Sequence, residues 1–311
     1  MPKMISNIVF TKNRPLQLEA YLESLYRHFP QEIIHTYVIY KVELFDEQYE
    51  LVFRKFPNCT VIKEADFHSD FLEVLNRVDT KYIMFGIDDV VFFDSVDFAA
   101  IDETFRRQAD NIFGFTMRFS RESLKDSNDV IEPVSAAGQE VYRLDWINGQ
   151  TPHTRYPWEL CCTVYSTDLV KKVISGTMNN NPLARKLFSP SSLLITTLAK
   201  VTSTRRILKS FGYFFSPNTV ESWNCRWCRN HSDQLPPFTY FQKLCASAIQ
   251  INMVNTSTKK TFDGTDELTV EALNSKYKQG YRMDIDAIAA NKPKALASGR
   301  EYFILTRKRE T

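Results

Sequence analysis

The sequence predicts an α/β fold in which helices flank a mainly parallel β-sheet, and two observations carry this prediction. Apolar stretches of strand length alternate with amphipathic stretches of helix length over residues 1–95. Such an alternation indicates right-handed crossover units, which place consecutive strands parallel to one another. The alternation then loosens, which predicts that residues 96–311 form an elaborated C-terminal half.

The first half divides into alternating strands and helices. Pro15 is a favourable first residue for a helix, and the apolar residues that follow it recur at helical spacing. The predicted strands are residues 5–13, 33–41, 59–65 and 81–87. The predicted helices are residues 15–29, 46–56 and 70–78.

The second half is less regular. Its pattern predicts a helix at 96–108, a strand at 112–120, a loop or strand that leads into a helix at 156–174, and a short strand at 248–254. Residues 121–150 are polar and are predicted to be rich in loops. We find no internal repeat, low-complexity tract or linker, so we predict one domain, 1–311, with a soft boundary near residue 95.

Composition narrows the partners and the compartment. The formal net charge of +2 gives no support for a nucleic-acid partner, because a basic face would bias the whole balance. The chain has no apolar run of the roughly 20 residues that span a bilayer, and its N-terminus lacks the apolar core of a secretory signal. We expect a cytoplasmic protein, or one at the cytoplasmic face of a membrane, with its six cysteines reduced.

Two adjacent carboxylates, Asp88 and Asp89, follow the apolar segment 81–87. Parallel sheets bind their ligands beyond the carboxyl ends of their strands, and Gly86 permits close approach of a neighbouring group. Paired carboxylates ionise together only when a cation neutralises them, which predicts Mg²⁺ or Mn²⁺ shared with a nucleotide diphosphate. The alternative is a solvated turn or helix cap, which Asp also favours.

Several segments together resemble GT-A-fold glycosyltransferases related to glycosyltransferase family 2. "VFTKNRPLQLEAYLESL" is similar to their first strand and helix, and "FGIDDVVF" is similar to their DXD motif in its Asp-Asp form. "RYPWELCCTVYSTDLV", "SPNTVESWN" and "LNSKYKQGYRMDIDAI" resemble later segments of a bacterial or viral subgroup of sugar transferases. The order and spacing of these segments, over most of the chain, carry the resemblance.

The resemblance implies a nucleotide-sugar-binding half at 1–95 and an acceptor-binding half at 96–311. It places Thr11, Asn13 and Arg14 at the nucleotide or its phosphates, although Asn13 and Arg14 could equally form only a polar turn before the helix. It implies that Asp88 touches the ribose or the metal and that Asp89 coordinates the metal directly.

An inverting transferase also needs a carboxylate that takes the proton of the acceptor hydroxyl. The resemblance favours Glu221 as this base and Glu159 as an acceptor-site or supporting residue, while either could be a surface glutamate or cap. Trp158 and Trp223 offer ring faces for an acceptor sugar. Many GT-A enzymes supply a late histidine as a third metal ligand, and "KALASGREYFILTRK" has none.

Three other features have competing interpretations. Cys225, Cys228 and His231 have a spacing that zinc sites use, although ordinary reduced thiols explain the cysteines more simply. Arg282 and Asp284 suit a phosphate contact or a helix start equally. The basic and apolar segment 185–215 could lie on an anionic membrane or form a solvated helix face.

The sequence therefore predicts a metal-dependent glycosyltransferase of the hexosyltransferase type. Its donor would be a nucleotide diphosphate sugar, most simply a UDP-sugar, and its acceptor a hydroxyl of a glycan or a lipid-linked saccharide. The alternative is a non-catalytic carbohydrate- or partner-binding protein that keeps the GT-A fold.

Overall fold

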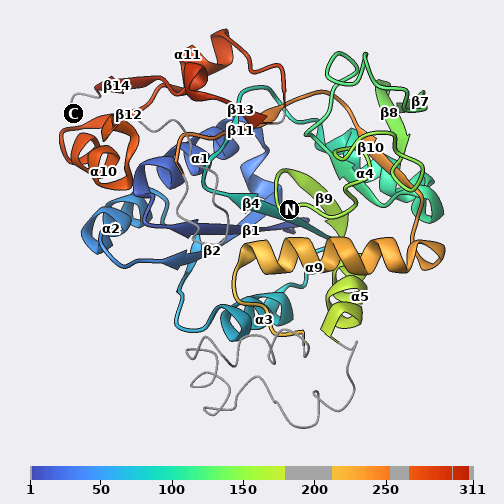
Figure 1. The fold of residues 1–311 in the computed structure, drawn as a ribbon, viewed down its shortest axis with the longest axis horizontal. Coiled ribbons are helices and arrows are strands. Elements are labelled where there is room, and N and C mark those ends of the chain that lie inside the picture. Colours follow the sequence, from blue (N-terminus) through green and yellow to red (C-terminus); the bar gives the residue numbers. More distant parts are fainter. Residues whose placement is uncertain (1, 179–211, 253–265, 296, 308–311) are drawn as a thin grey trace.

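A nine-stranded sheet runs through the computed structural model, which describes residues 2–178, 212–252, 266–295 and 297–307 (Figure 1). Across the sheet the strands are β3 (Thr60–Lys63), β2 (Ile34–Lys41), β1 (Ile5–Lys12), β4 (Tyr82–Ile87), β9 (Thr163–Ser166), β6 (Gly114–Thr116), β10 (Phe238–Phe241), β8 (Gln139–Asp145) and β7 (Ile131–Ala136). Only β9 and β8 run against the common direction. The predicted α/β class with a mainly parallel sheet is confirmed.

Helices cover both faces of the sheet. They are α1 (Pro15–His28), α2 (Asp46–Lys55), α3 (Phe67–Arg77), α4 (Phe98–Arg107), α5 (Thr167–Met178), α9 (Pro217–Asn230), α10 (Val270–Lys278) and α11 (Ile285–Ala290). In Figure 1, α1 and α10 lie on one side of the sheet, and α3, α5 and α9 lie on the other. The buried apolar residues form a separate large cluster on each side.

Two small sheets and several short turns of 3₁₀-helix complete the described structure. The first small sheet has the order β13 (Ala297–Ser298), β11 (Ala246–Ile249), β5 (Val90–Phe92), and the second pairs β12 (Tyr281–Met283) with β14 (Leu305–Arg307). The 3₁₀ turns are η1 (Gln31–Ile33), η2 (Ala109–Asn111), η3 (Ser232–Gln234), η4 (Asp266–Leu268) and η5 (Arg300–Tyr302).

The first half of the chain follows its sequence pattern closely. β1 and β2 are almost wholly buried, which explains why they read as continuous apolar runs instead of alternating ones. Gly86 is required because a Cβ there would overlap the ring of Tyr21, whose hydroxyl donates to Asn7 at 2.9 Å. The close approach predicted at Gly86 is therefore made by helix α1.

The second half differs from expectation at residues 121–150, which contain the hairpin β7–β8 at the edge of the sheet. Its exposed positions include Ser135, Gln139 and Glu140, and the type of turn at Ala137 and Gly138, both at positive φ, was not evident from the sequence. The strands at 112–120 and 248–254 were also predicted too long: β6 covers only Gly114–Thr116, and β11 ends at Ile249.

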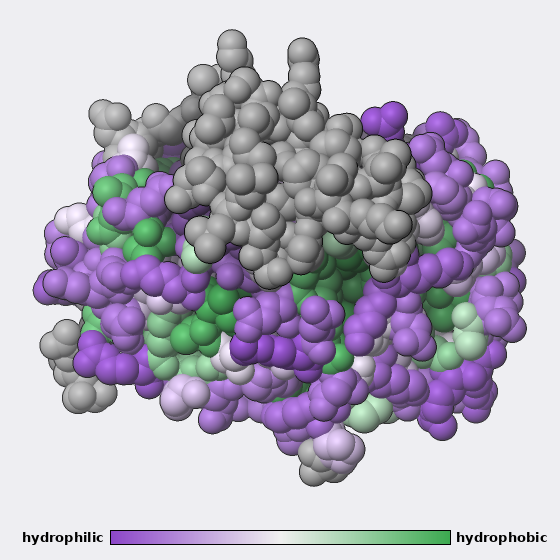
Figure 2. Space-filling model, turned by 90° about the horizontal axis from the view of Figure 1, so that it is seen from below, coloured by the Kyte–Doolittle hydropathy of each residue, from purple (hydrophilic) through white to green (hydrophobic). Residues whose placement is uncertain are grey.

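The described surface tests the predicted membrane contact of the segment 185–215 only in part, because most of that segment lies outside the described residues. On the face shown in Figure 2, the described surface is mainly hydrophilic, with hydrophobic residues visible in its recesses. None of the described helices is both long and apolar enough to cross a bilayer. The membrane contact of the segment 185–215 therefore stays a prediction.

Candidate active site

The aspartate pair occupies the turn between β4 and β5. Asp88 is only 3% exposed, and its Oδ2 accepts a hydrogen bond from Thr11 Oγ1 at 2.7 Å. Since β1 and β4 are adjacent parallel strands, the end of β1 delivers Thr11 to the end of β4. Thr11 and Asp88, which are far apart in the sequence, are thereby brought together as predicted for one site.

Arg14 lies against both aspartates. Its Nη1 is 3.2 Å from Asp88 Oδ1 and 3.6 Å from Asp89 Oδ2, and all three side chains are largely buried. Burial alone would lower the pKa of Arg14, but the two carboxylates outweigh it and raise that pKa. The guanidinium was expected at a phosphate, and here it neutralises the aspartate pair instead.

Tyr49, from α2, fixes this corner and was not anticipated from the sequence. Its hydroxyl accepts a hydrogen bond from the backbone N of Arg14 at 3.0 Å and lies 2.7 Å from Thr11 Oγ1. Tyr49 is completely buried, and the pattern of α2 marked it only as an apolar position. Hydrophobic periodicity predicts that Tyr49 is buried, but it does not predict that its hydroxyl reaches the end of β1.

Asn13 shapes the turn that presents Arg14. It adopts a φ of 53°, a left-handed conformation that Asn tolerates better than most residues. Its Oδ1 accepts from the backbone N of Glu43 at 2.9 Å, and its Nδ2 donates to Glu43 Oε2 at 3.4 Å. In this structure Asn13 contributes the polar turn, which was one of its two predicted roles.

The electrostatics of the pair are suited to a cation. Burial raises the pKa of Asp88 to about 6 against the opposing charge of Arg14, and burial raises the pKa of Asp89 as well. Asp89 Oδ1 is buried and has no hydrogen-bond partner among the described residues. This oxygen fits a divalent cation, although no cluster of three or more His, Cys, Asp or Glu side chains suited to a metal occurs in the described part of the chain.

Glu159 lies in the loop before β9 and is only 3% exposed. Its Oε2 accepts from the backbone N of Cys161 at 2.7 Å, while its Oε1 is buried and has no hydrogen-bond partner in the described part of the chain. Burial raises the pKa of Glu159, and the nearby charge of Arg118 opposes this shift. The alternative of a surface glutamate is therefore wrong for Glu159.

Glu221 lies in the first turns of α9, which begins with a capping box at Ser216. The backbone N–H of Leu160 bonds to its carboxylate, one residue before the amide that holds Glu159. Burial, followed by repulsion from Glu159, raises the pKa of Glu221 to about 7. Asp89 also contributes repulsion, so the structure brings the glutamates and the aspartate pair into one electrostatic neighbourhood.

Arg118 follows β6 and is a second residue that sequence reasoning missed. It is 4% exposed, and its Nη2 donates to the carbonyls of His153 at 3.0 Å and Tyr156 at 2.9 Å. It therefore fixes the loop that carries Glu159, and its charge acts on both glutamates. A lone arginine in a predicted strand gave no signal for this role.

The two tryptophans have different positions. Trp158 has no exposed surface and stacks on Tyr165, with ring centroids 4.8 Å apart. Its predicted role as an acceptor-stacking face is wrong for this structure, because its ring packs into the core. Trp223 on α9 is partly exposed and packs against Phe214 at 5.9 Å, so its stacking role stays a prediction.

The zinc interpretation gains no support from α9. Cys225 and Cys228 face the buried core, and the ring of His231 stacks on Trp227 with centroids 4.2 Å apart. Within the described residues these three side chains form no metal cluster. Burial raises the pKa of both thiols, which disfavours the thiolates that zinc requires.

Arg282 and Asp284 also have structural roles. Arg282 Nε lies 2.9 Å from Glu19 Oε2, which also accepts from the hydroxyl of Tyr277 at 2.5 Å. Asp284 caps α11 by accepting from the backbone N of Ala287 at 2.9 Å. The helix-start interpretation is confirmed for Asp284, and Arg282 docks the C-terminal segment onto α1.

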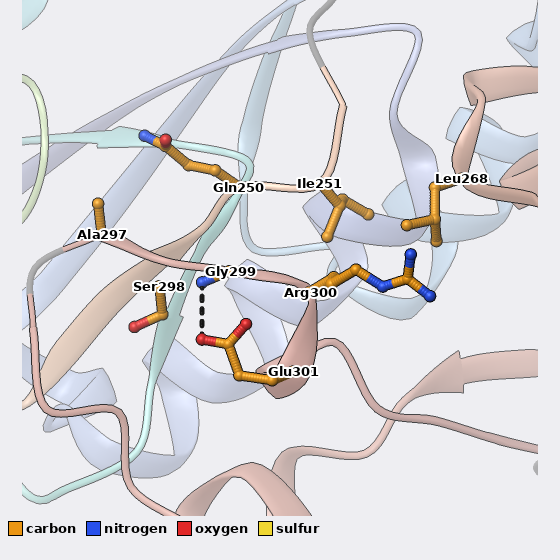
Figure 3. Close-up of a pocket in the computed structure, with 8 residues that line it drawn as sticks. All are labelled: Gln250, Ile251, Leu268, Ala297, Ser298, Gly299, Arg300 and Glu301. Atoms are coloured by element: carbon orange, nitrogen blue, oxygen red, sulfur yellow. Dashed lines mark hydrogen bonds between the residues drawn. The ribbon is translucent and has the colours of Figure 1, made fainter. Parts of the chain in front are cut away.

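A pocket of about 390 Å³ lies beside the small sheet that contains β5. The backbone N of Ile249 donates to the carbonyl of Asp89 at 2.8 Å, which links the pocket's strand β11 to the aspartate turn. Figure 3 shows the side chain of Arg300 between Ile251 and Leu268, while Glu301 turns back to the backbone N of Gly299. The aspartate turn thus has as a neighbour a cavity lined by apolar residues and by one residue of each charge, Arg300 and Glu301.

Comparison with known proteins gives one sequence relative. No protein-family model matches the chain. Over 190 residues, 54% of its length, the chain is 23% identical to the bifunctional glycosyltransferase pgtA of Dictyostelium discoideum. The match covers 25% of pgtA, so the chain spans about a quarter of the length of this curated relative. The chain is therefore similar in sequence to part of a glycosyltransferase.

Solved structures give weaker likenesses. TarS of S. aureus is 14% identical and superposes with a TM-score of 0.38, over 55% of this chain and 29% of that one. A complex of TarS 1–349 with UDP-GlcNAc is 15% identical, with a TM-score of 0.38 over 54% of this chain and 47% of that one. Likenesses this weak carry no argument, and the fold rests on the strand order described above.

Proposed function

We propose that this protein is a GT-A-fold glycosyltransferase that moves a sugar from a nucleotide diphosphate donor, most simply a UDP-sugar, to a hydroxyl of a glycan or lipid-linked acceptor. The observation that carries the proposal is the meeting of two carboxylate pairs. Asp88 and Asp89 lie at the carboxyl end of β4, and Glu159 lies in the loop that enters β9, the antiparallel neighbour of β4. Glu221 is close enough to both groups that the charges of Glu159 and Asp89 help to raise its pKa. The sequence similarity to pgtA supports the same class of reaction.

The aspartate corner, which consists of Asp88 and Asp89 with Thr11 and Arg14 against them, is the proposed donor side. The carboxyl ends of parallel strands, at the point where β1 and β4 meet, are the usual place for a nucleotide in such sheets. Asp89, with Asp88 beside it, would hold Mn²⁺ or Mg²⁺ through its buried oxygen without a partner. When bound, the metal would stabilise the charge that develops on the diphosphate leaving group.

The glutamate pair is the proposed acceptor side. A pKa of about 7 lets the Glu221 carboxylate accept the proton of an acceptor hydroxyl near neutral pH. Glu159, held by the Cys161 amide, would position the acceptor or support Glu221. Attack assisted by such a base on the face opposite the leaving group gives inversion. A cytoplasmic location, with or without contact with the inner face of a membrane, belongs to the same proposal.

Thermal unfolding with UDP and Mn²⁺ tests the donor side. Ligands that bind only the folded state raise the melting temperature, so UDP with Mn²⁺ should raise it and Asp89→Ala should remove the metal-dependent part. Asp46→Ala, which alters an exposed aspartate paired with Lys63, is the matched control and should leave the shift intact. A full shift in Asp89→Ala would place the metal elsewhere.

Turnover separates the enzyme from a non-catalytic binding protein. We expect slow hydrolysis of at least one nucleotide sugar in a panel measured with Mn²⁺, because water can replace the acceptor. Binding of donors without any turnover, with acceptors present, would favour the alternative of a carbohydrate- or partner-binding protein.

A further inference from the structure

The aspartate corner contains a buried hydrogen-bond donor and a buried acceptor that lack partners in the part of the chain that the structure describes. Arg14 Nε is a buried donor without an acceptor, and Asp89 Oδ1 is a buried acceptor without a donor, among the described residues. The two side chains nevertheless lie together, since Arg14 Nη1 is 3.6 Å from Asp89 Oδ2. The contact neutralises charge but leaves Arg14 Nε and Asp89 Oδ1 without partners within the described ranges.

Unused capacity of this kind makes the contact exchangeable. A buried donor or acceptor without a partner costs free energy, so a ligand that satisfies both atoms gains on each side. Arg14 Nε needs an anionic oxygen, and Asp89 Oδ1 needs a cation. A metal alone would be repelled by the guanidinium, and a diphosphate alone would be repelled by the carboxylates. A metal–diphosphate complex meets both needs at once.

The backbone around Arg14 is fixed, so its side chain is the part that can move. The backbone N of Arg14 donates to Tyr49 at 3.0 Å, and its carbonyl accepts from the backbone N of Leu18 at 3.0 Å. Pro15 occupies the first turn of α1, whose positive end faces the same corner. Asp88 keeps its bond from Thr11 whatever Arg14 does.

We propose that Arg14 exchanges partners when the donor binds. Its guanidinium moves from Asp89 to the diphosphate, and Asp89 becomes free to bind the metal. Arg14 then couples the two ligands, because each removes the obstacle that the other meets. Such coupling is reciprocal: the nucleotide strengthens metal binding by the factor by which the metal strengthens nucleotide binding. This inference rests on the proposed donor site and adds the coupling between its two ligands.

The experiment measures Mn²⁺ affinity by electron paramagnetic resonance or calorimetry, with and without UDP. In the unaltered protein UDP should tighten Mn²⁺ binding by about tenfold or more. In Arg14→Met, Mn²⁺ alone should bind about tenfold more tightly than before, and the tightening by UDP should be clearly smaller than in the unaltered protein, because only direct attraction between Mn²⁺ and the diphosphate remains. Lys12→Met is the matched control, since Lys12 is a cation of the same turn that pairs with Glu43 at 3.1 Å. It should leave the coupling unchanged.

The outcomes separate the inference from the proposed function. Binding of both ligands with the same coupling in Arg14→Met would overturn the role of Arg14 while leaving the donor site in place. Absence of UDP and Mn²⁺ binding in the unaltered protein would overturn the donor site itself. Arg14→Lys keeps the charge without the planar fork, so it should retain weak Mn²⁺ binding alone and regain part of the coupling. It tests the inference should the methionine variant fail to fold.

Discussion

The aspartate corner and the glutamate pair solve the same problem in opposite ways. Each places two carboxylates near an arginine, with Glu221 only partly buried. Arg14 lies within ion-pair distance of both aspartates, whereas neither glutamate has an ion pair within 4 Å in the described part of the chain. Arg118 donates hydrogen bonds to the backbone carbonyls of His153 and Tyr156 and not to the glutamates. The charge of the aspartates is neutralised by the guanidinium of Arg14. The glutamates have raised pKa values, so each carboxyl group stays protonated and neutral up to a higher pH.

This difference predicts different chemistry for the two pairs. Carboxylates that already hold a cation are suited to exchange it for another cation, such as a metal. A carboxyl group with a pKa of about 7, such as Glu221, is suited to take and release a proton near neutral pH. We therefore expect metal chemistry from the aspartates and proton chemistry from the glutamates.

The largest expected effect is the loss of turnover when Glu221, one member of the glutamate pair, is replaced. Glu221→Gln should lower turnover by roughly 10²–10⁴-fold, because the amide cannot take the acceptor proton. The melting-temperature shift with UDP and Mn²⁺ should remain, since the aspartate corner is untouched. Ser222→Ala, an exposed neighbour on α9, is the control for both measurements. Loss of the shift in Glu221→Gln would show that the two pairs do not act separately.

The pH profile of turnover sharpens the comparison further. Activity should rise with a midpoint near pH 7, because Glu221 must be ionised to act as a base. Around Glu221 lie Glu159 and Asp89, which raise its pKa, and Arg118 and the Leu160 amide, which lower it. Glu159→Gln should therefore move the midpoint down, and Arg118→Met should move it up.

Opposite shifts in these two variants are the decisive result, and each serves as the other's control. Midpoints that move together, or not at all, would mean that another group titrates. Both variants need a melting curve beside the rate, because Arg118→Met also frees the two loop carbonyls and should lower the melting temperature by several degrees.

The sequence predicts the aspartate corner better than the glutamate pair, for a physical reason. Asp88, Asp89 and Thr11 lie at the ends of regular strands, and parallel strand ends meet at one edge of a sheet. Hydrophobic periodicity locates strands, and so it locates their ends. The ion pairs of Arg14 with both aspartates were not anticipated, because periodicity does not say which charges pair.

The glutamate pair depends on packing that periodicity does not describe. Glu159 lies in an irregular loop, and Glu221 comes from a helix more than 60 residues later. Only their resemblance to known segments suggested that they belong to one site. Arg118, which fixes the loop, and Trp158, which is buried behind it, have roles set by tertiary contacts alone.

The smallest expected effect concerns the pH dependence of stability at the aspartate corner. The pKa of Asp88 is raised from its ordinary value to about 6, so the folded protein holds more protons than the unfolded chain between about pH 4 and pH 6. The free energy of unfolding should therefore fall as pH rises through this window. The contribution of Asp88 is on the order of 2 kcal/mol, present at low pH and lost above pH 6.

Urea unfolding at several pH values, with Asp88→Asn beside the unaltered protein, measures this contribution together with the interaction of Asp88 with Asp89 and Arg14, because groups that do not interact with Asp88 cancel in the difference. The stability advantage of Asp88→Asn should grow between pH 4 and pH 6, since the amide never carries the buried charge. A constant or reversed difference would mean that Arg14 neutralises Asp88 completely. In that case the aspartate corner would hold its cation too firmly for the exchange of partners that distinguishes it from the glutamate pair.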